Sequence, residues 1–310
     1  MPTEPIDDFI PRKMEPNLSK ILNQFSALIE ETVNYGSHIF KWCFNSISGG
    51  TEYIPVFLSF RHIFELLDSI SVLVKLSCVD PCKILLRSVF ESSLTIEYIL
   101  EKDTKQRGMN FMAWYYNQEL KILRRHDPDD QMSKEFRKKI DADNTLKGWK
   151  LPEFPTIKDE IDRQRNILKS KNYTESAKEI RRLKKKGITN PNWYTLHGEP
   201  RNVKELAEHL HRPGFYQILY RLWSPAVHGT DLIRNKISLD DAGHVNVWQI
   251  RSPKDAQEIT KFALSFALMN INIFKEYFIP TKKEEIANWY IKEIRDSYLE
   301  LMGKDIIQIE

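Results

Sequence analysis

The chain has 310 residues, of which 41% are hydrophobic and 29% are charged, and its formal net charge is +3. This composition predicts a soluble globular protein of one or two domains, and it excludes a disordered chain and a polycation. No apolar run reaches the roughly 18 residues that a membrane span needs, and no signal pattern opens the chain. We therefore expect a cytoplasmic protein with no membrane partner.

Apolar residues recur at spacings of three and four along most of the chain, which predicts amphipathic helices. After an N-terminal tail over 1–16, the expected helices are 17–47, 53–77, 80–102 and 105–126. Asp80 and Pro81 open the third of these, as an N-cap and a first-turn proline. Because the connections are short, we interpret the range 17–126 as the first helices of an up-down bundle.

The second half of the chain divides into a charged range and a more apolar one. We interpret 127–200 as a charged helical excursion from the bundle, or a lid over it, with a helical pair at 156–186. The range 201–310 supplies the remaining bundle helices, expected at 202–211, 213–228, 253–278 and 282–302. Ser252 and Pro253 are predicted to cap and open the helix 253–278. Residues 237–252 alternate around a DDAG turn and predict one short β-hairpin in an otherwise all-α single domain.

Several kinds of chemistry lack their sequence motifs. The three cysteines, Cys43, Cys78 and Cys82, have no zinc-site spacing, and we expect buried or partly buried thiols. The chain has no glycine-rich phosphate loop, no G-x-S-x-G elbow and no H-E-x-x-H motif. We therefore expect no cofactor and no metal.

The stretch YRLWSPAVHGTD, residues 220–231, places polar side chains inside an apolar helix. On an α-helix, Arg221, Ser224 and His228 would share one face, which would line up a cation, a hydroxyl and an imidazole. The alternative is a kinked helix end, with Pro225 breaking the helix and Gly229 following its last turn. Helix geometry alone leaves both interpretations open.

Two other polar features stand out. Arg87 and Glu91 are four residues apart, so they form either a solvent-facing ion pair or a polar seam inside the bundle, which Tyr98 extends. Ten Lys or Arg and three acidic residues lie between Asp162 and Lys186. This segment is either a solvated basic face or a surface that meets phosphates. Its RNA-binding candidates are Arg181, Arg182, Lys184, Lys185 and Lys186.

Two stretches, LRSVFESSLTIEYIL (86–100) and FYQILYRLWSPAVHGT (215–230), resemble an uncharacterised bacterial all-helical family, a domain of unknown function. That family is similar to the HEPN superfamily. The resemblance is carried by an early helix and a late helix end, with the residues Arg87, Glu91, Tyr98, Tyr220, Ser224, Val227, His228 and Gly229.

The resemblance implies a HEPN-like helical bundle and a metal-independent endoribonuclease, acting as a toxin or an anti-phage defence effector. Arg221 and His228, separated by six residues, match the superfamily's Arg…His motif at its long limit and would be the catalytic pair. Ser224 and Tyr220 would orient the phosphate or the histidine, and Arg87, Glu91 and Tyr98 would support them. The resemblance also implies a homodimer, an RNA substrate and an antitoxin or defence-system partner protein.

Two other functions compete with the ribonuclease. Leu222 stands where active members carry a polar residue, and Pro225 interrupts the motif's spacer. Both features favour a non-catalytic helical module that binds a partner protein or a nucleotide through the same groove. In a third interpretation the bundle is purely structural, and His228 and Gly229 only end a helix.

Overall fold

The computed structural model describes residues 3–46, 50–198, 200–223, 236–303 and 306–307. The chain divides into two compact units. The first comprises residues 1–50, 56–100 and 207–310, and the second comprises residues 51–55 and 101–206. The described residues are mostly helical, and one two-stranded sheet accompanies the helices. The predicted all-α fold class with one short hairpin is therefore confirmed.

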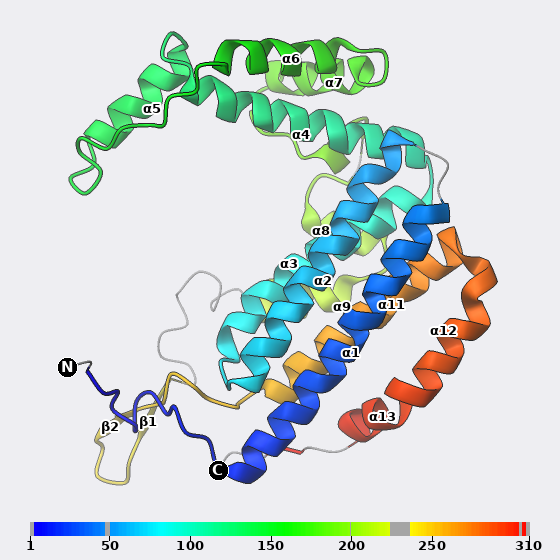
Figure 1. Cartoon of the computed structure of the whole chain (residues 1–310). Helices are drawn as coiled ribbons and strands as arrows, with labels where there is room; N and C mark the ends of the chain where they lie inside the picture. Colours follow the sequence, from blue (N-terminus) through cyan, green and yellow to red (C-terminus); the bar gives the residue numbers. More distant parts are fainter. Residues whose placement is uncertain (1–2, 47–49, 199, 224–235, 304–305, 308–310) are drawn as a thin grey trace. The chain divides into compact units, whose positions relative to one another are not determined.

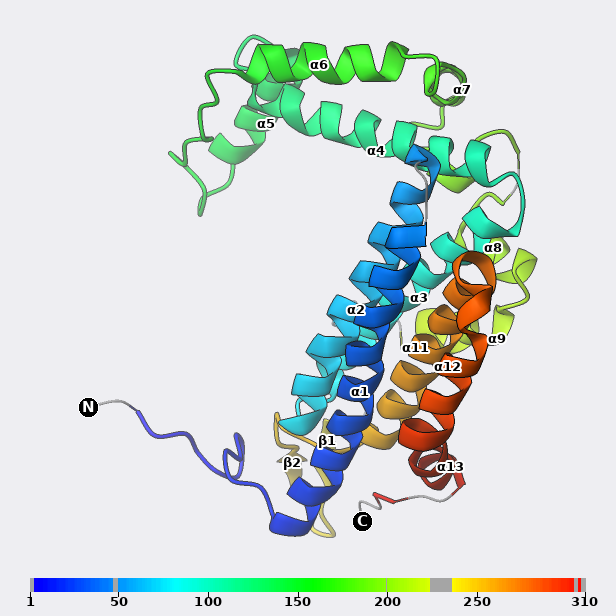
Figure 2. The same ribbon diagram turned by 45° about the vertical axis from the view of Figure 1, so that its right-hand side comes forward.

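The first unit is a bundle of long helices. Its main members are α1 (Pro16–Ser46), α2 (Ile54–Lys75), α3 (Asp80–Glu101) and α11 (Ala256–Phe278). They run side by side in both views of the ribbon (Figures 1 and 2). The sequence periodicity predicted all four within a few residues, and Asp80 begins α3 as expected.

An aromatic layer holds this bundle together. The rings of Phe60 and Phe274 are 3.9 Å apart between centroids, and Phe57 meets Phe274 edge-on at 5.5 Å. Phe60 is 1% exposed and also packs on Phe64 and Phe40. These contacts join α1, α2 and α11, because side chains at spacings of three and four face the same side of each helix.

The start of α11 corrects one prediction. Ser252 and Pro253 precede the helix, which begins at Ala256. Asp255 stands before it in a left-handed conformation, with φ 66° and no capping hydrogen bond from its side chain. Its carboxylate instead accepts a hydrogen bond from Lys83 of α3, at 2.7 Å. This tertiary ion pair engages the carboxylate that would otherwise cap the helix. The predicted N-cap at Ser252 and first turn at Pro253 are therefore wrong.

The C-terminal part of the first unit is less regular than predicted. The expected helix 282–302 is divided into α12 (Lys283–Trp289), a π-helical turn (Tyr290–Ile294) and α13 (Arg295–Gly303). The hairpin pairs β1 (Ile237–Leu239) with β2 (Val245–Val247), antiparallel. Asp240 closes its turn by accepting hydrogen bonds from the backbone of Ala242 and His244.

The second unit is built on α4 (Thr104–His126), the fourth helix of the predicted range 17–126. It also holds α5 (Gln131–Asp141), α6 (Ile157–Lys169) and α7 (Thr174–Lys185), the last two being the predicted charged pair. Its core includes Met109, Met112 and Ala113 of α4, with Tyr173 before α7 and Ile180 and Leu183 within it. The chain then returns to the first unit through α8 (Val203–His209).

Candidate functional site

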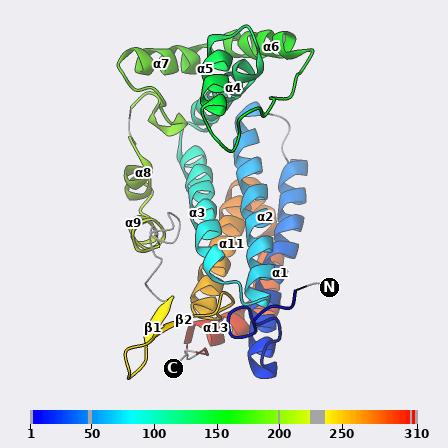
Figure 3. The ribbon, with the colours of Figure 1, turned by 90° about the vertical axis from the view of Figure 1, so that its left-hand side faces the viewer.

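The candidate site lies where the late segment 209–223 runs beside α3. After α8, the short helix α9 (Pro213–Tyr216) is followed by a π-helical turn, Gln217–Leu222. Phe215 anchors the segment by packing on Phe90 of α3, with 6.1 Å between ring centroids, and on Phe266 of α11, at 4.9 Å. Figures 1 and 3 show α9 beside α3. The two sequence stretches that carry the resemblance are therefore in direct contact.

Three polar side chains meet at this contact. The Arg87 Nε donates to Glu91 Oε1 at 3.4 Å, and the Arg87 guanidinium carbon lies 3.8 Å from the centroid of the Tyr220 ring. The Tyr220 hydroxyl donates to the same Glu91 oxygen. Tyr216 stacks on Tyr220 at 5.1 Å, so the ring is held from a second side. Arg87 is thus paired with a carboxylate and with an aromatic face, an arrangement that orders both partners.

The Arg87–Glu91 pair is neither fully exposed nor fully buried. The Arg87 side chain is 22% exposed and that of Glu91 is 47% exposed. Burial nevertheless raises the pKa of the Glu91 carboxyl above its ordinary value of 4.5, and Arg87 opposes that rise. The Arg87–Glu91 pair therefore lies at the edge of the bundle, where Tyr220 covers the arginine and solvent still reaches the carboxylate.

Removing the Arg87 cation should raise the pKa of Glu91 further. In Arg87→Gln the opposing charge is lost while burial remains, so the carboxyl should protonate at a higher pH than in the wild type. Since the pKa of Glu91 is higher in the folded than in the unfolded state, protonation of Glu91 stabilises the fold, and this stabilisation is complete below the unfolded pKa. It is lost as the pH rises through the folded pKa. A carboxyl titration by NMR measures the change, and Arg61→Gln, which removes the exposed partner of Glu65, should leave Glu91 unaltered.

A second ion pair, six residues further along α3, ties this helix to the same segment. The Arg212 Nε lies 3.2 Å from both carboxylate oxygens of Glu97. Glu97 is 12% exposed, and burial raises its pKa while Arg212 lowers it. Next to it the buried ring of Tyr98 meets His209 edge-on at 5.7 Å. Tyr98 therefore supports α8 through its ring contact with His209.

Breaking the Glu97–Arg212 pair should destabilise the bundle. Arg212→Met leaves the nearly buried Glu97 carboxylate without its cation, and we expect a loss of about 2 kcal/mol in the free energy of unfolding at neutral pH. Urea unfolding measures it. The loss should shrink at a pH where Glu97 is protonated. Arg201→Met, which removes a 74% exposed side chain from its pair with Glu205, should cost far less. Equal losses in the two variants would contradict the role given to Arg212.

The predicted catalytic residues are only partly within the described chain. Arg221 is exposed in the π-helical turn, and its side chain makes no hydrogen bond or ion pair with another described residue. The turn replaces the α-helix that the prediction assumed for residues 217–222, so the α-helical angle between positions does not apply there. Ser224 and His228 lie outside the described residues. Their alignment with Arg221 stays a prediction.

The predicted RNA-binding residues lie in different environments. Arg182 forms a two-pronged ion pair with Glu179, with both distances 2.6 Å, so its charge is neutralised within α7. Lys184 is partly buried and turns toward α4, where it donates to Asn117 Oδ1 at 3.2 Å. Arg181, Lys185 and Lys186 are exposed.

A family model covers the part of the chain that holds this site. The sequence profile of a family described as "Family of unknown function (DUF5677)" matches residues 53–244, more than half of the chain. The chain belongs to this family. The matched range includes Arg87, Glu91, Tyr220 and Arg221, so the DUF5677 region contains both sides of the contact. No curated protein and no solved structure matches the chain.

The DUF5677 region also contains two residues that sequence reasoning missed. Glu97 and Arg212 are 115 positions apart, and nothing local in the sequence pairs them. Helix geometry gives no signal for them either, because Glu97 lies about 120° around α3 from Glu91. The cysteines behave as predicted. Cys43 and Cys82 are buried and free, and burial raises the pKa of each thiol to about 12, which makes them poor nucleophiles.

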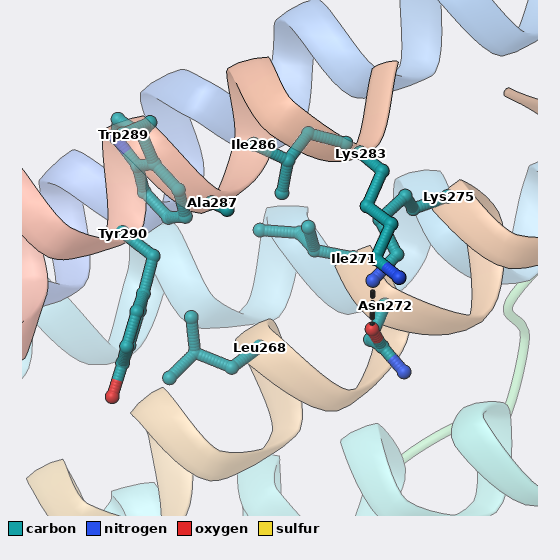
Figure 4. Close-up of a pocket in the computed structure, with 9 residues that line it drawn as sticks. All are labelled: Leu268, Ile271, Asn272, Lys275, Lys283, Ile286, Ala287, Trp289 and Tyr290. Atoms are coloured by element: carbon teal, nitrogen blue, oxygen red, sulfur yellow. Dashed lines mark hydrogen bonds between the residues drawn. The ribbon is translucent and has the colours of Figure 1, made fainter. Parts of the chain in front are cut away.

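One cavity of this DUF5677 chain lies between α11 and α12 and has a volume of about 390 Å³ (Figure 4). Leu268, Ile271, Ile286 and Tyr290 form apolar walls, and Lys275 donates to Asn272 Oδ1 at one end. This lining suits the binding of an apolar molecule. The described residues form no cluster of metal-ligating side chains, and none of the described helices is both long and apolar enough to cross a membrane.

Proposed function

We propose that the protein is a metal-independent endoribonuclease of the HEPN type. The observation that supports this function best is the contact between the two resemblance stretches. Arg87 and Glu91 of the early helix meet Tyr220, which lies 129 positions after Glu91 and directly before Arg221. A rigid aromatic ring held by an ion pair can fix the position of the exposed arginine that follows it.

The reaction needs a base, an acid and a group that stabilises the charge on the phosphorane. A base removes the proton from the ribose 2′-hydroxyl, whose oxygen attacks the neighbouring phosphorus. An acid protonates the 5′-oxygen as its bond to phosphorus breaks. The products are a 2′,3′-cyclic phosphate and a 5′-hydroxyl. Histidine serves as base or acid because its pKa lies near neutrality, and His228 takes this role in the proposal.

Arg221 stabilises the charge that develops on the phosphorane, since the planar guanidinium donates two parallel hydrogen bonds to phosphate oxygens. Its exposed position leaves it accessible to a substrate. Ser224 and Tyr220 orient the phosphate or the histidine. Arg87 and Glu91 act through Tyr220, because their contacts end on its ring and hydroxyl.

The proposal includes a homodimer in the cytoplasm. One His228 would act as the acid and its copy as the base, so two protomers would complete one site. The biological role that fits such an enzyme is a toxin or an anti-phage defence effector, held in check by an antitoxin or another defence-system protein. Light scattering on the purified protein tests the dimer, and a monomer at all concentrations would refute the shared site.

The alternative function is a non-catalytic module that binds a partner protein or a nucleotide through the same groove. Leu222 favours it, because this apolar side chain is 50% exposed directly after Arg221. A hollow of about 600 Å³, lined in part by Phe215, Phe262 and Glu258, adjoins the same segment. The test is incubation of the wild type with total RNA or tRNA in EDTA. Cleavage supports the ribonuclease, and intact RNA together with nucleotide binding supports the module.

A further inference from the structure

The second unit carries a basic stripe that extends beyond the predicted segment. Polar and basic side chains recur along α4 at spacings of three and four, which places them on one side of the helix. They are Asn117, Gln118, Lys121, Arg124 and Arg125. Lys184 of α7 joins this side through its hydrogen bond to Asn117. The stripe therefore combines residues from two helices of the same unit.

The lysines of this stripe are bound to neutral groups. The Lys121 Nζ donates to Gln118 Oε1 at 3.0 Å and to Asn190 Oδ1 at 2.7 Å, and the Lys184 Nζ donates to Asn117 Oδ1 at 3.2 Å. Both side chains are partly buried. Among the described residues neither lysine has a carboxylate partner, so two partly buried ammonium groups lack a compensating negative charge.

The charges also repel one another. Burial lowers the pKa of Lys184, and Lys121 and Arg124 lower it further. Burial likewise lowers the pKa of Lys121, and Arg125 adds to that effect. Arg124 differs from the lysines, because Asp130 accepts hydrogen bonds from it at 2.7 and 3.2 Å. A bound anion would offset both the burial and the repulsion.

The amides complete the donor set. Asn117, Gln118 and Asn190 use their side-chain oxygens to accept from the lysines. Their NH₂ groups are consequently directed away from the lysine nitrogens and can donate to another acceptor. A phosphate group, with several acceptor oxygens and a negative charge, matches ammonium and amide donors together.

We propose that Lys121 and Lys184, with the amides of Asn117 and Asn190, form a binding site for the phosphate groups of single-stranded RNA. The choice of RNA rests on the proposed ribonuclease function. A slender strand can bring its phosphates to partly buried amines between two helices, whereas a flat anionic membrane would meet the exposed Lys185 and Lys186 first.

Fluorescence anisotropy with a labelled single-stranded RNA tests the site. The full chain carries His228→Ala so that the RNA stays intact. Lys121→Gln/Lys184→Gln should weaken binding about tenfold at low salt, and the slope of log K against log salt should become less steep by about 1.4, because two phosphate contacts are lost. Lys147→Gln/Lys150→Gln removes the same charge from exposed positions of the same unit and should change affinity less than about twofold. Circular dichroism shows that each variant keeps its helical content.

Two results would overturn the site. Equal losses in the two double variants would mean that only net charge matters. Absent RNA binding together with binding to phosphatidylserine vesicles would assign the stripe to a membrane surface. The outcome is separable from that of the enzymatic proposal. RNA that is bound through Lys121 and Lys184 and never cleaved refutes the ribonuclease alone, and cleavage that is unaffected by the double variant refutes the site alone.

Discussion

Replacing His228 with alanine is expected to slow RNA cleavage by about 10²–10⁴-fold, the usual contribution of a general acid or base. Arg221→Ala is expected to slow it by about 10²–10³-fold, because the charge on the phosphorane loses its preorganised donor. Arg221→Lys should recover part of the rate, since it keeps the charge and loses the two-pronged geometry. Initial rates on a labelled RNA in EDTA measure all three variants.

The control for this series is His244→Ala. His244 lies in the hairpin turn, its side chain is 78% exposed, and among the described residues it pairs only with Asp240. The His244→Ala variant should therefore cleave RNA like the wild type. Urea unfolding of each variant separates chemistry from folding. Arg221 is exposed, so its replacement should leave stability within about 0.5 kcal/mol of the wild type. Alanine variants at Arg221 and His228 that cleave at the wild-type rate would contradict the catalytic assignment.

Phe60→Ala is expected to have the largest effect on stability, a loss of about 3–5 kcal/mol. Phe60 is 1% exposed and contacts the rings of Phe40, Phe64 and Phe274, which come from α1, α2 and α11. Truncation removes these contacts and leaves a cavity where three helices meet, so neighbouring side chains can fill it only in part. Chemical denaturation followed by circular dichroism measures the loss.

The matched control lies on the same helix. Leu58→Ala truncates a side chain that is 57% exposed, so it should cost less than about 1 kcal/mol. If Leu58→Ala were as costly as Phe60→Ala, or if Phe60→Ala were nearly neutral, the aromatic layer would not be the main support of the bundle. Leu58 would then have to be covered by a contact that the described chain does not contain.

The sequence predicts the long helices well because their signals are local. Spacings of three and four determine which face is apolar, and Asp80 with Pro81 determines where α3 begins. The prediction of the start of α11 is wrong because Lys83, 172 positions away, binds the carboxylate of Asp255. The π-helical turn at 217–222 also has no local signal, since its Tyr220 is held by Phe90 and Glu91 of another helix.

In the candidate site, too, the sequence predicts local contacts better than contacts between distant residues. The Arg87–Glu91 pair follows from a spacing of four, and its presence is confirmed at 3.4 Å. Its contact with Tyr220 was expected only through the family resemblance. The Glu97–Arg212 pair and the Lys121–Lys184 stripe join residues far apart in sequence, and charge counts cannot locate such pairs. The count that singled out 163–186 also included Arg182, which Glu179 neutralises.

The central claim is that this DUF5677 protein cleaves RNA without a metal. End-group analysis of RNA incubated with the wild type in EDTA tests it most directly. The predicted result is fragments with 2′,3′-cyclic phosphate and 5′-hydroxyl ends, formed by the wild type and absent with His228→Ala. Intact RNA, or fragments with 3′-hydroxyl and 5′-phosphate ends, would contradict it.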